Sequence, residues 1–212
     1  MAEGKRQGRG GYAAGDGGGV IVAAVLLAAA PLPAADAATL GRRIATAKVQ
    51  PARALADALA QFDRQFAASY AHAAGRAATP VQKRRLARMR AAGRAELTRL
   101  MNTDALPWLM TLTERDYRHH YSAAELAAIA GFWTSPAGAA LTRAMHQAGA
   151  KGGTLTLPAE HRDAIAAYLS SPAGQKESAR SAALQTAMAR SMTAFLQRAQ
   201  PRISARIAAA GQ

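Results

Sequence analysis

The chain has 212 residues, a length typical of one domain; half of its residues are hydrophobic but only 5% are aromatic. An alanine-rich composition of this kind favours helices with small side chains and disfavours a β-sandwich, which needs many β-branched and aromatic residues. The absence of cysteine excludes disulfides, thiolate metal sites and a cysteine nucleophile. The formal net charge is +14, so any partner recognised by charge is expected to be anionic.

The N-terminal segment has the three parts of a secretory signal peptide. Basic residues near the start precede an uncharged apolar run, Val20–Ala30, and Ala35–Ala37 offers small residues for cleavage. The apolar run is shorter than the roughly 20 residues that span a bilayer as a helix. We therefore expect residues 1–37 to be a signal peptide cleaved after Ala37, and residues 38–212 to be a single mature domain without a transmembrane span. An uncleaved interfacial anchor, a buried core helix and a translation start further downstream are the alternatives.

Apolar residues recur at helical spacing through the first half of the expected mature domain. Thr79 and Pro80 are typical of an N-cap and a first helical residue, so they predict a helix that continues to about Leu100. A third helix is expected from about Asp104 to His119, with Trp108 half buried. The helix expected between Arg53 and Tyr70 presents one apolar face: Leu55, Leu59, Phe62, Phe66 and Tyr70.

The second half of the chain also lacks convincing strand alternation. A capping box formed by Ser122 and Glu125 predicts a short helix from Ala123 to about Thr134. Gly149–Leu157 is expected to be a loop. The last apolar repeat ends near Ala199, and Pro201 is expected to end or kink its helix. The chain is therefore predicted to be an all-α helical bundle.

One segment is repeated within the chain. Residues 122–138 align without gaps on residues 158–174, with eight of 17 positions identical, including a whole Ser-Pro-Ala-Gly tetrapeptide. The residue before a proline avoids the helical conformation, so each copy stops one short helix; the serine can then cap the next helix, and the proline fits its first position. We expect a helix–corner–helix unit used twice. Its structural residues are Ser135, Pro136, Gly138, Ser171, Pro172 and Gly174, and its core residues are Ile129, Phe132, Trp133, Ile165 and Tyr168.

These motifs resemble a bacterial family known as domain of unknown function 2059. Residues 132–138 (FWTSPAG) match its aromatic pair, Ser-Pro, small residue and glycine, and residues 168–176 (YLSSPAGQK) add the Gln-Lys that often follows. The first copy departs from the pattern after its glycine, and the second copy has Tyr-Leu in place of two aromatics. The resemblance covers about residues 104–176. It implies an exported helical protein and carries over no catalytic residues.

The histidines and carboxylates form no recognisable catalytic or metal-binding motif. Adjacent His119 and His120 point about 100° apart on a helix, and Asp116 with His120 is more typical of a surface ion pair than of a metal site. Zinc-protease, nucleophile-elbow and phosphate-loop motifs are absent from the sequence, and the carboxylates are sparse. We therefore expect no enzymatic activity, no cofactor and no metal.

A dense basic cluster is the strongest sign of an interaction. Eight basic residues lie between Arg76 and Arg99, opposed only by Glu96. Three of them, Arg84, Arg85 and Arg88, lie near one stripe of the expected helix. Such a stripe is either an ordinary solvated face or a contact site for an anionic partner.

The expected location decides which partner this stripe would meet. After export to the periplasm or beyond, it would be an anionic surface of the cell envelope or an envelope protein. If Val20–Ala30 is not a signal, the alternative is a cytosolic nucleic-acid-binding protein. We expect no specific nucleic acid, because the cluster has no interleaved aromatics for base stacking and no nucleic-acid-binding motif.

Overall fold

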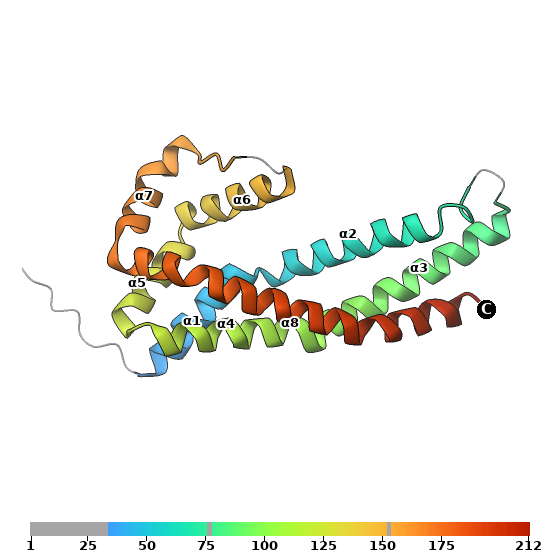
Figure 1. The fold of residues 1–212 in the computed structure, drawn as a ribbon, viewed down its shortest axis with the longest axis horizontal. Coiled ribbons are helices and arrows are strands. Elements are labelled where there is room, and N and C mark those ends of the chain that lie inside the picture. Colours follow the sequence, from blue (N-terminus) through green and yellow to red (C-terminus); the bar gives the residue numbers. More distant parts are fainter. Residues whose placement is uncertain (1–33, 76–77, 152–153) are drawn as a thin grey trace, which may run out of the picture. The chain divides into compact units, whose positions relative to one another are not determined.

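The computed structural model describes residues 34–75, 78–151 and 154–212 (Figure 1). The described part contains helices and connecting turns and no strand, which confirms the all-α prediction. In chain order the elements are α1 (Ala34–Val49), α2 (Pro51–Ser69), α3 (Pro80–Leu100), the π-helical turn η1 (Met101–Ala105), α4 (Leu106–His120), α5 (Ala123–Trp133), α6 (Pro136–Lys151), the 3-10 turn η2 (Ala159–His161), α7 (Arg162–Ser170) and α8 (Pro172–Ala210).

The expected signal peptide falls almost entirely outside the described residues. Only its last four residues are described, and they belong to α1, so the predicted cleavage position after Ala37 lies in the first turn of that helix. The described helices contain no segment that is both long and apolar enough to cross a membrane.

α3 and α4 follow one another without a loop. The turn η1 joins them, and Leu100 and Leu106 on either side of it both have helical backbone angles. Pro107 accounts for the wider turn, because it has no N–H to donate and its ring would collide with a carbonyl of the preceding turn in a regular α-helix. Trp108, expected to be half buried, is 55% exposed on α4.

Two boundaries differ from the sequence prediction. α6 extends to Lys151, so the first residues of the expected loop Gly149–Leu157 are helical. The helix α8 does not end at Pro201 but continues to Ala210. Phe195 before the proline and Ile203 after it belong to the same apolar cluster, and this packing outweighs the hydrogen bond that proline removes.

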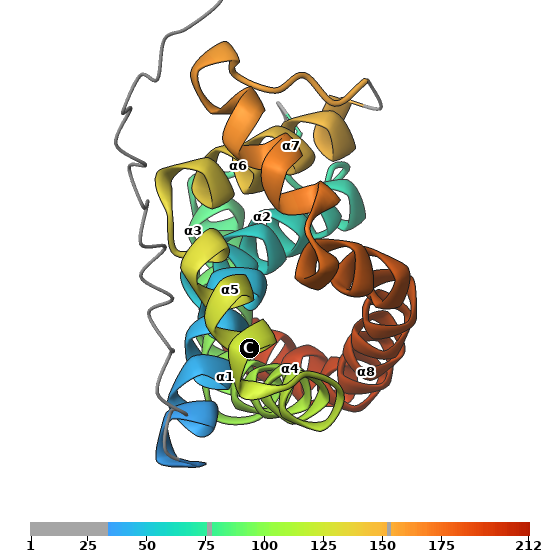
Figure 2. The same cartoon turned by 90° about the vertical axis from the view of Figure 1, so that its left-hand side faces the viewer.

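Two apolar clusters hold the helices together. One lies where α1 packs on α4 and α5 (Figure 2), and it contains the predicted core residues Ile129 and Ile165, both fully buried. Phe132 and Tyr168 are also buried there, and Trp133 packs against the cluster partly buried. The other cluster joins α3, η1 and α4 to α8. The core prediction is therefore confirmed for all five residues, with Trp133 at the edge.

The two Ser-Pro corners make the same hydrogen bonds. Ser135 Oγ donates to the carbonyl of Phe132 (2.6 Å) and accepts from the amide of Gly138 (3.2 Å). Ser171 Oγ does the same with Tyr168 (2.7 Å) and Gly174 (3.1 Å). Each serine thus closes one helix and caps the next.

The residues that precede the two corners also meet in space. Phe132 and Tyr168 occupy equivalent positions in the aligned segments, and their rings stack with centroids 3.8 Å apart and planes 3° from parallel. This contact joins α5 to α7.

Candidate functional site

The basic cluster lies on α3, whose start is fixed by a complete capping box. Thr79 Oγ1 accepts a hydrogen bond from the Gln82 amide (3.2 Å), and Gln82 Oε1 accepts one from the Thr79 amide (2.7 Å). Pro80 occupies the first helical turn. The predicted N-cap is therefore confirmed; the reciprocal bond from Gln82 was not part of the prediction.

Arg84, Arg85 and Arg88 are all exposed on the first half of α3. No carboxylate of the described residues lies within ion-pair distance of them. Their guanidinium groups are therefore free for a partner. The helix does bring the three together, as the stripe pattern predicts.

The next arginines of the cluster have a structural role. Arg90 Nε lies 2.8 Å from Asp63 on α2, and Arg94 binds the other oxygen of the same carboxylate. The hydrogen bond from Arg90, with the charges of both arginines, holds the pKa of Asp63 below its usual value. These two arginines therefore attach α2 to α3.

Glu96 gathers a second group of arginines between α3 and α8. It is only 7% exposed. Arg99 of α3 lies 2.6 Å from it, and Arg202 and Arg206 of α8 lie at 3.6 and 3.9 Å. The hydrogen bond from Arg99, together with the positive charges around it, keeps the pKa of Glu96 low.

A buried carboxylate, Glu177 of α8, is the centre of a polar network that sequence reasoning missed. Both of its oxygens accept from the Trp133 indole N–H, at 2.9 and 3.0 Å. The Tyr117 hydroxyl donates to one oxygen and the Tyr168 hydroxyl donates to the other, the latter at 2.5 Å. Lys48 of α1 completes the network, with Nζ 3.0 Å from Glu177 Oε1 and 3.4 Å from the centroid of the Trp133 ring.

The ionisation of this network follows from burial and mutual attraction. Burial alone would raise the pKa of Glu177, but the charge of Lys48 and three hydrogen bonds outweigh it and hold the pKa below its usual value. Burial lowers the pKa of Lys48, and Glu177 offsets only part of that effect. Burial and the nearby carboxylate raise the pKa of Tyr117 and Tyr168. The Lys48 ammonium, the two tyrosine hydroxyls and the Trp133 indole N–H thus all bind the Glu177 carboxylate. This arrangement stabilises the fold and leaves neither oxygen of Glu177 free as a proton acceptor.

A signal for Glu177 was present in the sequence. It is the only acidic residue after Asp163, and it lies three and four positions beyond Gly174 and Ala173. On a helix these three residues share one face, and the small residues mark it as the buried one. Lys48 has no comparable signal, because a lysine in the last turn of a helix is usually a surface residue.

The expected pair of Asp116 and His120 is present on α4. Nδ1 of His120 lies 3.5 Å from the Asp116 carboxylate and 2.8 Å from its carbonyl oxygen, while Arg180 of α8 binds the same carboxylate. Within the described residues no group of three potential ligands could hold a metal ion.

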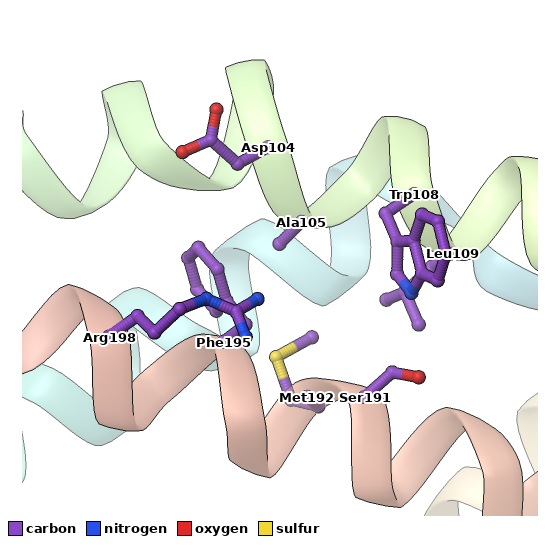
Figure 3. Close-up of a pocket in the computed structure, with 8 residues that line it drawn as sticks. All are labelled: Asp104, Ala105, Trp108, Leu109, Ser191, Met192, Phe195 and Arg198. Carbon is purple, nitrogen blue, oxygen red and sulfur yellow. The ribbon is translucent and has the colours of Figure 1, made fainter.

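The surface of the described residues has hollows of very different size, and one of about 380 Å³ lies between α1 and the end of α5. A groove of about 800 Å³ lies between α2, α3 and α8; its walls include Phe62, Phe66, Leu196 and Ile207, and no charged residue lines it. A pit of about 40 Å³ lies between α4 and α8 (Figure 3). Since a cavity that holds one water molecule needs about 10–15 Å³ on this measure, the pit has room for only a few water molecules and is too small for an organic ligand. Trp108 and Arg198 border this pit.

Comparison with known proteins finds one segment that is similar to a bacterial family. Residues 109–159 match the family described as uncharacterized protein conserved in bacteria (DUF2059). This match confirms the family resemblance inferred from the Ser-Pro motifs. It covers about a quarter of the chain, and the second motif, residues 168–176, lies wholly beyond it. No curated protein and no solved structure matches the chain.

Proposed function

We propose that this protein is an exported, non-catalytic interaction protein of the bacterial cell envelope, and that it contacts an anionic envelope surface through Arg84, Arg85 and Arg88. The observation that carries the proposal is the state of these three arginines. They are exposed side by side on α3 without a carboxylate partner among the described residues, while Arg90 and Arg94 of the same helix are engaged with α2. Clustered positive charge of this kind attracts anionic surfaces.

The buried carboxylate supports binding over catalysis. Glu177 is 4% exposed, and its oxygens are occupied by Lys48, Trp133 and two tyrosines. A general base needs a free oxygen within reach of substrate, and this group has none. The buried carboxylate Glu96 and the partly buried carboxylates Asp63 and Asp116 are engaged with arginines.

Export is tested by intact-mass and N-terminal peptide analysis of the protein in fractionated cells. We expect a periplasmic species that begins at Ala38. A full-length cytosolic species would contradict the proposal and make nucleic acid the leading partner, since a basic face also binds polyphosphates.

The arginine contact is tested by co-sedimentation with vesicles that contain anionic phospholipid. The variant carries Arg84→Gln, Arg85→Gln and Arg88→Gln. The matched control carries Arg43→Gln, Arg143→Gln and Arg162→Gln, three exposed arginines on other helices that make no ion pair with a described residue. Each arginine near an anionic membrane contributes about 1 kcal/mol, so we expect binding to weaken about 100-fold in the variant and much less in the control. Equal losses of binding in the variant and in the control would mean that net charge alone, and not these three arginines, accounts for the contact.

A further inference from the structure

We propose that the surface around Glu96 on α3 and α8 lies directly on an anionic phospholipid bilayer, with Trp108 at the level of the head groups. We call this surface the Glu96 face; it comprises Arg99, Arg198, Arg202, Arg206 and Trp108. The inference rests on the proposed envelope function and extends it, because only Arg84, Arg85 and Arg88 carry that proposal. It assigns a second set of residues, an orientation and a lipid partner.

The first observation is an excess of positive charge on two packed helices. Arg99, Arg202 and Arg206 surround the single carboxylate of Glu96, with their side chains 46, 54 and 70% exposed. One carboxylate neutralises one of these three charges. Residues 178–210 of α8 and the two residues that follow them contain no Asp or Glu. Asp104 also lies beside this face, where it borders the pit next to Trp108, and its charge acts on Arg99.

The face is continuous with the arginines of the proposed envelope contact. Arg88 and Arg99 are eleven residues apart on α3, which is about three helical turns, so both project to the same side. α8 packs along α3, and Ile207 and Gly211 lie next to Gly93 and Met89. Arg206 therefore lies beside the middle of α3, at a level along the helix axis between Arg88 and Arg99. The two sets of arginines form one basic surface.

The second observation is an exposed tryptophan at the end of this surface. Trp108 is 55% exposed, and it borders the small pit between α4 and α8 together with Arg198 (Figure 3). Arg198 is exposed and one helical turn from Arg202. Indole rings are enriched at membrane interfaces, because one part of the ring is apolar while its N–H binds water or head groups.

The pairing of arginine with tryptophan favours a bilayer over a soluble polyanion. Guanidinium groups bind phosphate oxygens in pairs of hydrogen bonds, and both lipid head groups and nucleic acids offer phosphate. An apolar layer beneath the phosphates is specific to a bilayer, and Trp108 is the residue of this face whose apolar ring would reach the edge of that layer while its N–H stays among the head groups. The pit beside Trp108 holds about 40 Å³, so a small soluble ligand is not its occupant.

The experiment measures tryptophan emission while the protein, as isolated from its cells, is titrated with vesicles. One set contains phosphatidylglycerol in phosphatidylcholine, and the other contains phosphatidylcholine alone. We expect a blue shift and quenching by brominated acyl chains with the anionic set only. Trp108→Phe should abolish both signals, because Trp133, the only other tryptophan, is held by Glu177. The Phe variant should still sediment with anionic vesicles, a few-fold more weakly.

A pair of arginine variants tests the face independently. Arg198→Gln with Arg202→Gln removes two charges while Glu96 keeps Arg99 and Arg206. At about 5-fold per arginine, binding should weaken about 25-fold. Arg143→Gln with Arg162→Gln, two exposed arginines on α6 and α7, is the matched control and should lose much less.

The outcomes separate this inference from the proposed function. One set of results would keep the envelope contact and overturn the Glu96 face. In it, the Arg84, Arg85 and Arg88 variant loses binding, vesicles leave the Trp108 emission unchanged, and the Arg198 and Arg202 variant binds as well as the wild type. If the protein does not bind anionic vesicles at all, both proposals fail. If double-stranded DNA produces the same emission shift as vesicles, the bilayer assignment is overturned.

Discussion

Lys48 of α1 and Glu177 of α8 form a buried ion pair, with Nζ 3.0 Å from Oε1 and side chains 23 and 6% exposed. The pair joins the first described helix to the last. Trp133 contacts both partners, through its ring to the ammonium and through its N–H to the carboxylate. Hydrogen bonds from α4 and α7 reach the same carboxylate, so one acidic side chain connects five helices.

Glu177→Gln should destabilise the protein strongly. The substitution leaves the buried Lys48 charge without its counter-ion and gives two tyrosine hydroxyls and the indole N–H a weaker acceptor. Breaking a buried pair by removing one partner costs about 3–5 kcal/mol; because Lys48 is partly exposed, we expect about 3 kcal/mol. Urea unfolding followed by circular dichroism measures the change.

A double-mutant cycle shows whether that loss comes from the pair. The cycle combines Lys48→Met with Glu177→Gln, which removes both charges together while the glutamine amide oxygen still accepts from the Trp133 N–H and the tyrosine hydroxyls, so no charge is left buried without a partner. The double variant should therefore be more stable than Glu177→Gln. A loss in the double variant equal to the sum of the single losses would mean that the two residues act separately.

The same carboxylate should make stability depend on acid pH. The pKa of Glu177 is lower in the folded protein than in the unfolded chain, so the unfolded chain binds its proton first as pH falls. The stabilisation is complete above pH 4.5, the ordinary value, and is lost as pH falls through the folded pKa. Urea unfolding between pH 7 and 3 should show a decline in the wild type that is shallower in Glu177→Gln. Parallel declines would assign the acid sensitivity to other carboxylates.

The glycines of the two corners should not tolerate alanine. A Cβ on Gly138 would overlap the carbonyl oxygen of Phe132, and one on Gly174 would overlap that of Tyr168. Because these obstacles are backbone atoms, we expect each substitution to cost about 1–3 kcal/mol or more. Gly131 of α5 is the control: its Cβ would meet nothing within 4 Å, so Gly131→Ala should stabilise the helix by about 0.5–1 kcal/mol. Thermal unfolding of the three variants gives the comparison.

Sequence reasoning predicted the features that depend only on residues close together in the chain. The capping box at Ser122, the N-cap at Thr79 and the buried face of Ile129 and Ile165 depend on neighbours within a turn or two, and the structure confirms them. Pro201 shows the limit, since α8 does not end there but continues to Ala210, with apolar packing on both sides of the proline. The network at Glu177 lay beyond such reasoning, because its partners come from four other helices.

The candidate site was predictable only in its first part. The stripe of Arg84, Arg85 and Arg88 follows from helical spacing, whereas the arginines around Glu96 come together only when α8 packs on α3. The sequence also does not show which arginines of α3 form ion pairs and which remain free. Arg90 and Arg94 look like their neighbours until Asp63 of α2 is placed beside them.

Stability measurements should separate the free arginines from the paired ones. The triple variant with Arg84→Gln, Arg85→Gln and Arg88→Gln loses no contact with a described carboxylate, so its unfolding free energy should stay within about 0.5 kcal/mol of the wild type. Asp63→Asn removes one charge but weakens two ion pairs between α2 and α3, so its urea midpoint should fall.

Both sets of variants are compared at low and high salt. The midpoint of Asp63→Asn should approach that of the wild type as salt screens the pairs, because exposed ion pairs weaken with ionic strength. The triple variant should instead gain slightly at low salt, where mutual repulsion among the arginines of α3 is strongest. A triple variant that unfolds more readily than Asp63→Asn would show that these arginines stabilise the fold, and the case for a free contact surface on α3 would be lost.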